Sequence, residues 1–266
     1  MSNDLKELVR TKYAELADAN QSCCGSDRQK VYQIMMDDYS HVAGYVADAD
    51  LGLGCGLPTQ FAEIRPGDTV LDLGSGAGND CFVARHEVGE TGHVIGVDFT
   101  PEMIARAREN ADKRAFTNVE FREGDIEALP VADQSIDVVV SNCVLNLVPN
   151  KAAVAREVFR VLKPSGHFSI SDIVLVGSLP EPLRREAELY AGCVSGAIPL
   201  DDYVGLFASL GFLHLQIQKQ KPIHLPDEVL LRYLSPAEVT EYRNGSNGIF
   251  SITLYGVRPM PVSCCG

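Results

Sequence analysis

Apolar residues recur along this chain in two patterns. Short continuous apolar runs, typical of strands buried on both faces of a sheet, alternate with stretches that place apolar residues at helical spacing. The runs predict strands over 69–73, 93–97, 119–122, 136–141 and 167–173. The helical spacing predicts crossover helices over 79–88, 100–114 and 151–162. Strands that alternate with helices in this way build a parallel sheet, so the middle of the chain is predicted to be an α/β unit.

The two ends of the chain show other patterns. Further helices are predicted over 3–17, 28–37, 182–190 and 203–210. Alternating polar and apolar positions predict a sixth strand over 213–219 and a last strand over 249–257, with a helical insertion over about 227–243. We therefore expect a Rossmann-like α/β fold. Its seven-stranded sheet should be mostly parallel with an antiparallel last strand, accompanied by N-terminal helices and a C-terminal helical insertion.

Three glycines at alternate positions, Gly74, Gly76 and Gly78, end the first predicted strand. Glycine lets backbone turn sharply and lets a ligand approach the main chain closely, so this loop is a candidate ligand site. It lacks the Gly-Lys-Ser/Thr that marks a phosphate-binding P-loop. Asp72, just before the first glycine, favours the cationic end of a cofactor over a pyrophosphate.

Two more predicted strands end in acidic residues. Asp98 follows the second strand at the spacing expected for an acid that holds ribose hydroxyls. Asp125 and Ile126 follow the third, where they suit an adenine edge, and Met103 in the next helix could cover the adenine. Together these residues fit a nucleoside that carries a positive sulfonium, S-adenosylmethionine (SAM). A Rossmann-like domain for another nucleotide is the alternative.

The glycine loop, the acid after the second strand and the Gly-Asp after the third resemble the motifs of class I SAM-dependent methyltransferases. The resemblance implies the class I methyltransferase fold, with SAM as cofactor. It implies cofactor contacts from Asp72, Gly74, Ser75, Gly76, Gly78, Asp98, Met103, Asp125, Ile126 and Asn142.

The amino-acid composition limits the classes of partner that the protein is expected to bind. The chain of 266 residues has 36 acidic against 23 basic residues, a formal net charge of −13 that repels phosphate backbones and anionic lipid. Neither nucleic acid nor a membrane is an expected partner. No apolar run reaches signal-peptide or membrane-spanning length, so a cytoplasmic location is expected. Eight cysteines in such a protein indicate metal, metalloid or redox chemistry.

Three cysteines lie in separate loops that the predicted topology gathers at the carboxyl edge of the sheet: Cys55, Cys143 and Cys193. Thiolates are soft ligands, but zinc would prefer a fourth Cys or His, often with a Cys-x-x-Cys pair. Three thiols without a fourth ligand suit a three-coordinate ion with a lone pair, such as trivalent arsenic. By contrast, Cys81 is expected to be a buried, inert thiol, and Lys151 a solvated helix start.

The segments Leu-Gly-Leu-Gly-Cys55-Gly-Leu-Pro, Ser-Asn-Cys143-Val-Leu-Asn-Leu and Gly-Cys193-Val-Ser-Gly-Ala resemble those of arsenite methyltransferases, over roughly residues 20–220. The resemblance implies that Cys143 and Cys193 hold As(III) and that Cys55 joins them as ligand and disulfide partner. It also implies a part for a further N-terminal cysteine, Cys23 or Cys24. Cys264 and Cys265 are either an idle tail or a means of passing metalloid on.

The resemblance implies methyl transfer from SAM to cysteine-bound As(III), giving methylated arsenicals in arsenic detoxification. The substrate would be arsenite or its thiol adducts, and a thiol reductant such as glutathione or thioredoxin would return the cysteines to the reduced state. The alternatives are a methyltransferase of an organic small molecule with incidental cysteines, and a non-catalytic metalloid-sequestering protein.

The chain is expected to divide into three parts: 1–60 (N-terminal helices and cysteine loops), 61–220 (SAM-binding catalytic domain) and 221–266 (insertion, last strand and Cys-Cys tail).

Overall fold

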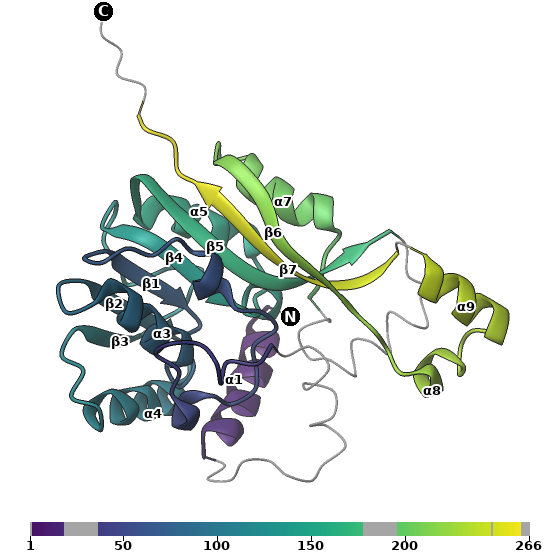
Figure 1. Cartoon of the computed structure of the whole chain (residues 1–266), viewed down its shortest axis with the longest axis horizontal. Coiled ribbons are helices and arrows are strands. Elements are labelled where there is room, and N and C mark those ends of the chain that lie inside the picture. The colour runs from purple at the N-terminus through teal and green to yellow at the C-terminus, as the bar shows by residue number, and fades with distance from the viewer. Residues whose placement is uncertain (1, 19–36, 178–195, 246, 262–266) are drawn as a thin grey trace, which may run out of the picture.

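The computed structural model describes residues 2–18, 37–177, 196–245 and 247–261. Its centre is one seven-stranded sheet in the order β3-β2-β1-β4-β5-β7-β6 (Figure 1). The strands are β1 (Thr69–Leu73), β2 (His93–Asp98), β3 (Val119–Glu123), β4 (Ile136–Asn142), β5 (Leu162–Val176), β6 (Leu213–Ile223) and β7 (Gly248–Val257). The first five pair in parallel, and β7 runs antiparallel to both β5 and β6. The predicted α/β sheet is therefore confirmed.

Helices cover both faces of this sheet. Helices α3 (Asn79–Val88) and α4 (Pro101–Asp112) cover one face, and α5 (Lys151–Val161) and α7 (Leu200–Ala208) cover the other. Helix α1 (Ser2–Asp18) packs on α4, whereas α8 (Asp227–Leu230) and α9 (Pro236–Asn244) lie at the far end of β6 and β7 (Figure 1). The described residues also include short 3-10 helices at Ala47–Ala49, Pro58–Phe61 and Leu145–Leu147. None of the helices within the described ranges is long and apolar enough to cross a membrane.

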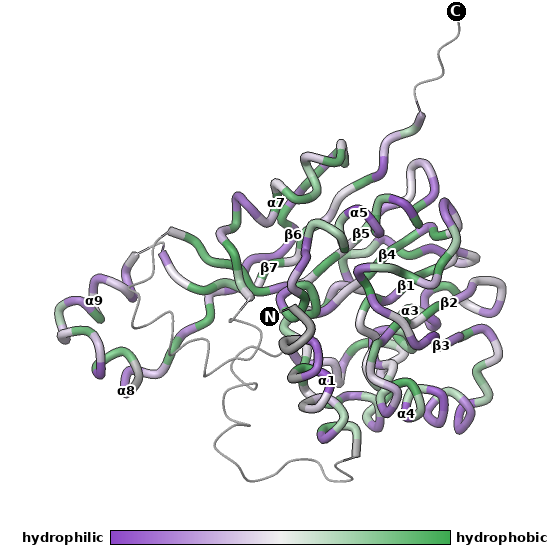
Figure 2. Tube along the Cα trace, turned by 180° about the vertical axis from the view of Figure 1, so that it is seen from behind, coloured by the Kyte–Doolittle hydropathy of each residue, from purple (hydrophilic) through white to green (hydrophobic). Residues whose placement is uncertain are grey.

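Neighbouring residues of β1 show how the two layers form. Val70 packs into an apolar cluster with α3 and α4, whereas Leu71 packs into another with α5 and α7. Successive strand side chains point to opposite faces, so continuous apolar runs bury both faces. Figure 2 shows the result, with apolar residues along the central strands and polar ones on the outer turns of the helices.

Two elements differ most from the sequence prediction, besides β6, which was predicted over 213–219 and extends to Ile223. Strand β5 was predicted over 167–173 but runs over Leu162–Val176, because Leu162 pairs with Ile136 of β4 and the pairing with β7 continues to Val176↔Gly248. The predicted helical insertion over 227–243 is two short helices, α8 and α9. Ser235 starts α9 with a capping box, which explains the break between them. Neither difference moves the carboxyl edge of the sheet, where the candidate site lies.

Candidate active site

A cavity of about 130 Å³ lies at the carboxyl edge of the sheet. Its walls come from the ends of β1, β2 and β4, the loop after β3, the segment 39–54 and helix α1. Most of the predicted cofactor residues line it: Asp72, Gly74, Ser75, Gly76, Asp98, Met103, Asp125, Ile126 and Asn142. Gly78 is not among the lining residues. It precedes α3 with φ +98°, and an added Cβ there would meet Phe82 and Phe121.

The cavity wall offers polar groups that are free to bind a ligand. The side-chain oxygens Ser75 Oγ, Asn79 Oδ1 and Thr100 Oγ1 are buried without a hydrogen-bond partner among the described residues. Gly76, at φ +50°, has open space where a Cβ would stand. Buried polar atoms normally find partners, so the wall fits a polar ligand that supplies them and approaches the main chain at Gly76. Thr100 directly precedes α4, but its hydroxyl does not cap that helix.

Three buried carboxylates, of Asp72, Asp80 and Asp98, face the cavity. Burial raises the pKa of each above its ordinary value, because the charged form loses its hydration. Asp98 keeps two backbone donors, since it accepts from Gly76 N at 3.0 Å and from Thr100 N at 2.9 Å. A bound cation would favour the ionised form of these acids, so the cavity suits a positively charged ligand.

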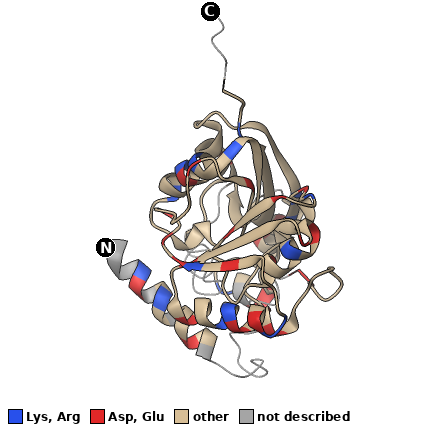
Figure 3. Cartoon of the chain, turned by 90° about the vertical axis from the view of Figure 1, so that its left-hand side faces the viewer, with Lys and Arg blue, Asp and Glu red and all other residues tan. Residues whose placement is uncertain are grey.

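Helix α1 closes one side of the cavity through Lys6 and Tyr13. The helix carries both acidic and basic residues (Figure 3). Lys6 pairs with Asp125 at 2.6 Å and also with Glu127, which ties α1 to the loop after β3. Sequence analysis missed this wall, because nothing in the helical spacing of α1 shows what it packs against.

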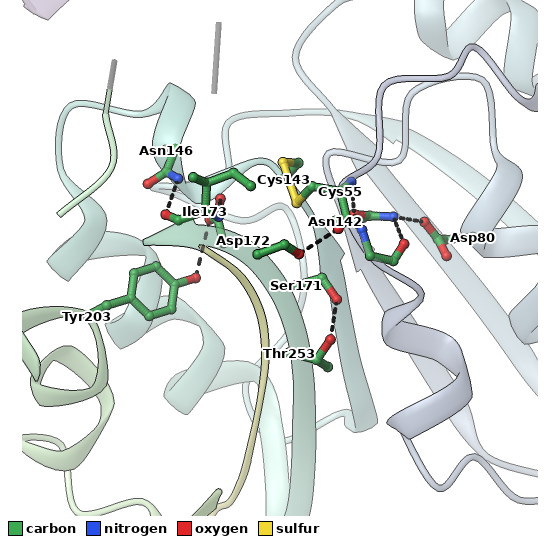
Figure 4. The surroundings of a disulfide bond; sticks show 12 residues. Cys55, Asp80, Asn142, Cys143, Asn146, Ser171, Asp172, Ile173, Tyr203 and Thr253 are labelled. Atoms are coloured by element: carbon green, nitrogen blue, oxygen red, sulfur yellow. Dashed lines mark hydrogen bonds between the residues drawn. A yellow bond between two sulfur atoms is a disulfide. The ribbon is translucent and has the colours of Figure 1, made fainter. Parts of the chain in front are cut away.

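Cys55 and Cys143 form a disulfide with a Cα–Cα distance of 5.7 Å (Figure 4). Both residues are buried. Cys143 also lines the cavity. The structure thus brings together two of the three predicted thiols, directly beside the candidate cofactor site.

Close backbone approach explains the glycines on either side of Cys55. A Cβ on Gly54 would lie 2.6 Å from Asn142 Nδ2, and one on Gly56 would lie 2.5 Å from Ser171 Oγ. Asn142 Oδ1 accepts hydrogen bonds from the N–H groups of Cys55 (3.0 Å) and Gly56 (3.2 Å). Ser251 Oγ donates to the Cys55 carbonyl at 2.6 Å. The Gly-Cys-Gly loop is therefore fixed against the ends of β4 and β5.

Cys143 has a left-handed backbone, with φ +62°. This conformation costs a residue with a Cβ roughly 1–2 kcal/mol, so the surroundings must hold it in place. Its N–H donates to the Ser171 carbonyl at 2.8 Å, directly after β4 ends. Sequence analysis placed Cys143 just past a strand end, but had no signal for this conformation.

Asn142 links the thiol pair to the acids of the cavity. Its Nδ2 donates to Tyr39 Oη at 2.7 Å and to Asp80 Oδ2 at 3.2 Å, and Tyr39 donates to Asp80 at 2.8 Å. Burial and the Asp80 charge raise the pKa of Tyr39 well above its ordinary value, so the hydroxyl keeps its proton. Tyr39 and Asp80 line the cavity and were not predicted, although Asp80 stands only two residues after the glycine loop.

Asp172 is a third residue that sequence analysis missed. It lies in β5, it is fully buried, and its carboxylate and the two sulfurs all lie within 4.8 Å of one another. Burial raises its pKa to about 7, against the hydrogen bonds and the charge of Lys151 that lower it. An acid inside an otherwise apolar run, Ser-Asp172-Ile, was the available signal.

Other predicted residues fall into two groups. Cys193, Cys23, Cys24, Cys264 and Cys265 lie outside the described residues. Cys81 is buried with a free thiol that donates to Asp72 at 3.3 Å, and burial followed by the Asp72 charge raises its pKa well above the usual value. Such a thiol stays protonated and unreactive, as expected. The prediction of a solvated Lys151 is wrong: the side chain is half-buried, and desolvation lowers its pKa.

A family model described as "Methyltransferase domain" matches residues 64–228. An arsenite methyltransferase of Halobacterium salinarum is 46% identical over 80% of this chain and 59% of its own length. The human arsenite methyltransferase is 35% identical over 79% of this chain and 58% of its own length. The chain thus spans about three-fifths of the curated relatives it matches.

Among solved structures, an arsenic(III) S-adenosylmethionine methyltransferase from Chlamydomonas reinhardtii is similar, with a TM-score of 0.64 at 33% identity. The match covers 87% of this chain and 74% of that one.

Proposed function

Because the chain belongs to the SAM-dependent methyltransferase-domain family and, within it, to the arsenite methyltransferases, we propose that it transfers the methyl group of SAM to trivalent arsenic bound by cysteine thiolates. The position of Cys143 carries most of this proposal. Its side chain belongs both to the wall of the cofactor cavity and to the thiol pair with Cys55. A methyl donor in the cavity and an arsenic atom on that sulfur would be neighbours.

The cavity residues hold the cofactor, which supplies an activated methyl group. Asp98, which accepts from two backbone N–H groups, would use its remaining lone pairs to accept from the ribose hydroxyls. Asp72 and Asp80 face the cationic end, where burial makes their charge most effective. Met103 supplies the apolar cover for the adenine beside Asp125 and Ile126. The free oxygens of Ser75, Asn79 and Thr100 are available for the remaining polar groups.

The thiols hold the arsenic. As(III) arrives as arsenite or a thiol adduct and exchanges onto Cys55, Cys143 and Cys193. Each protein thiol gives its proton to the ligand that it displaces, which leaves as water from arsenite or as free thiol from the adduct. No general base acts on the nucleophile, because the arsenic lone pair attacks the methyl carbon directly. The protein contributes alignment of arsenic with the methyl group, which is worth roughly 7–11 kcal/mol at best.

The thiols also supply electrons. Methyl transfer leaves arsenic pentavalent, and return to the trivalent state takes two electrons. Cys55 and Cys143 provide them by forming a disulfide, which an external dithiol or two monothiols then reduce. The Cα–Cα distance of 5.7 Å between them supports this step, because disulfides bridge Cα atoms about 4.4–6.8 Å apart.

A turnover assay tests the proposal. The protein is incubated with SAM, arsenite and a thiol reductant, and the arsenic species are separated. We expect methylated arsenicals from the wild type and none from Cys143→Ser. Arsenite bound without any methylated product would indicate a sequestering protein. Unchanged methylation by Cys143→Ser would exclude the thiol site.

A further inference from the structure

The proposed reaction leaves one buried charged group beside the thiols unused. The carboxylate of Asp172 lies within 4.8 Å of both the Cys55 and Cys143 sulfurs and has no contact with solvent. Burying a carboxylate costs free energy unless hydrogen-bond donors or positive charges surround it. The position of Asp172 beside the reacting sulfurs therefore needs an explanation.

Polar groups around Asp172 favour its ionised form. Its Oδ1 accepts from Ile173 N at 2.9 Å, and its Oδ2 accepts from the Tyr203 hydroxyl at 3.3 Å. The backbone N–H of Asn146 and the positive charge of Lys151 favour the same form. Burial opposes the charge, so these donors and the nearby lysine are the partners that a buried carboxylate needs.

The methyl transfer moves a positive charge toward these thiols. The arsenic lone pair forms the As–C bond while the S–C bond of the sulfonium breaks, and the bonding pair of that S–C bond stays on the sulfur. The formal positive charge therefore leaves the cofactor sulfur and appears on arsenic. No proton moves in this step.

The arrangement places Asp172 where this charge arrives. Cys143 lines the cofactor cavity and Asp172 does not. In Figure 4, Asp172 and the cavity residue Asp80 lie on either side of the disulfide. A charge that passes from the cavity to arsenic on these sulfurs thus comes under the influence of Asp172.

We propose that the ionised carboxylate of Asp172 stabilises the positive charge that develops on thiolate-bound arsenic during methyl transfer. This inference rests on the proposed function. Preorganised charges at a dry site act strongly on a developing charge, and the loss of one such group typically slows a reaction by about 10²–10³-fold. Asp172 should therefore affect the rate of the chemical step much more than the affinity for either substrate.

The test is Asp172→Asn, which keeps the shape of the side chain and removes its charge. Arsenite and SAM affinities are measured by calorimetry, and methyl transfer is followed in a single turnover on arsenite-loaded protein. We expect a rate about 100-fold below wild type, with both affinities within about threefold. Asp172→Ser is a second neutral variant, should the first not fold. Tyr203→Phe, which removes one donor and keeps the carboxylate, should cost only about three- to fivefold.

Three outcomes would overturn the inference. A neutral variant that transfers methyl groups within about fivefold of wild type would show that the charge is not needed. A variant whose arsenite affinity falls as much as its rate would show a ligand or structural role instead. A wild type that binds arsenite but never methylates it would remove the proposed function, and this inference with it. Only the first two leave the proposed function standing.

Discussion

The cofactor cavity and the thiol site adjoin each other, but they are built in different ways. The cavity takes its main residues from the ends of consecutive parallel strands, where Asp72, Asp98 and Asp125 follow or end β1, β2 and β3. The thiol site joins Cys55 and Cys143, which are 88 residues apart, through a loop pressed against β4 and β5. The cavity is therefore determined by residues at the ends of single strands and in the turns that follow them. The thiol site depends instead on the packing of two segments that are far apart in the sequence.

The two regions meet at the end of β4. Asn142 holds the Cys55 loop through its carbonyl and contacts Asp80 and Tyr39 through its amide. Cys143, the next residue, belongs to both regions. Variants on either side of this junction should therefore separate cofactor binding from arsenic binding.

The largest effect is expected from Cys143→Ser. A hydroxyl is a hard, weak ligand for As(III), so arsenite affinity should fall by more than about 100-fold. SAM affinity should stay within about threefold, because Ser keeps nearly the size of Cys at the cavity wall and the proposed cofactor contacts come from other residues. Isothermal calorimetry with each ligand measures both. Tight arsenite binding by this variant would place the arsenic elsewhere.

Asp98→Ala should show the reverse pattern. If Asp98 accepts from two ribose hydroxyls as proposed, its loss should weaken SAM binding by at least about 100-fold, since hydrogen bonds to charged groups contribute about 1.5–3 kcal/mol each. Arsenite affinity should change by less than about threefold. If the SAM affinity measured by calorimetry were unchanged, Asp98 would be a helix-capping acid only.

A smaller effect is expected from Gly56→Ala, which tests the close approach of the loop. The new Cβ would lie 2.5 Å from Ser171 Oγ, so the loop must shift, and methylation should fall about tenfold. The Cβ of Ser171 would lie almost as close, at 2.6 Å, so Gly56→Ala/Ser171→Gly, which removes both obstructing atoms, should recover part of the rate. The control is Gly205→Ala in α7, where nothing lies within 4 Å of the added Cβ. That change should leave methylation unaffected and stabilise the helix by up to about 1 kcal/mol.

The remaining effect is on stability instead of activity and concerns Asp80 and pH. Burial raises its folded-state pKa from 3.8 to about 6, so between pH 4 and 6 the folded protein binds more protons than the unfolded chain. Its contribution to stability is complete below pH 4 and is lost as pH rises through 6. The free energy of unfolding of wild type should therefore fall relative to Asp80→Asn, by up to about 1.4 kcal/mol per pH unit. Denaturant unfolding from pH 4 to 8 measures this. A constant difference would contradict the raised pKa.

Strand ends explain what could be predicted from the sequence. Apolar runs fix where β1 to β4 end, and parallel strands end at one edge, so Asp72, Asp98, Asp125 and Cys143 were placed correctly. Residues whose partners lie far away in the sequence were not marked by a strand end. Asp172 and Asn142 gain their partners through β5 and the Cys55 loop, and the left-handed Cys143 depends on Ser171. Lys151 was misread because its charged head faces Asp172, which only the fold reveals.

One measurement tests the central claim that arsenic on Cys143 accepts the methyl group from the adjoining cavity. Reduced protein is loaded with arsenite, freed of thiol and mixed with SAM labelled in its methyl group. The account predicts about one labelled methylarsenical per site, together with a newly formed Cys55–Cys143 disulfide found by mass spectrometry of peptides. Label that appears on arsenic in equal amount from Cys143→Ser, or no labelled arsenical from loaded wild type, would contradict it.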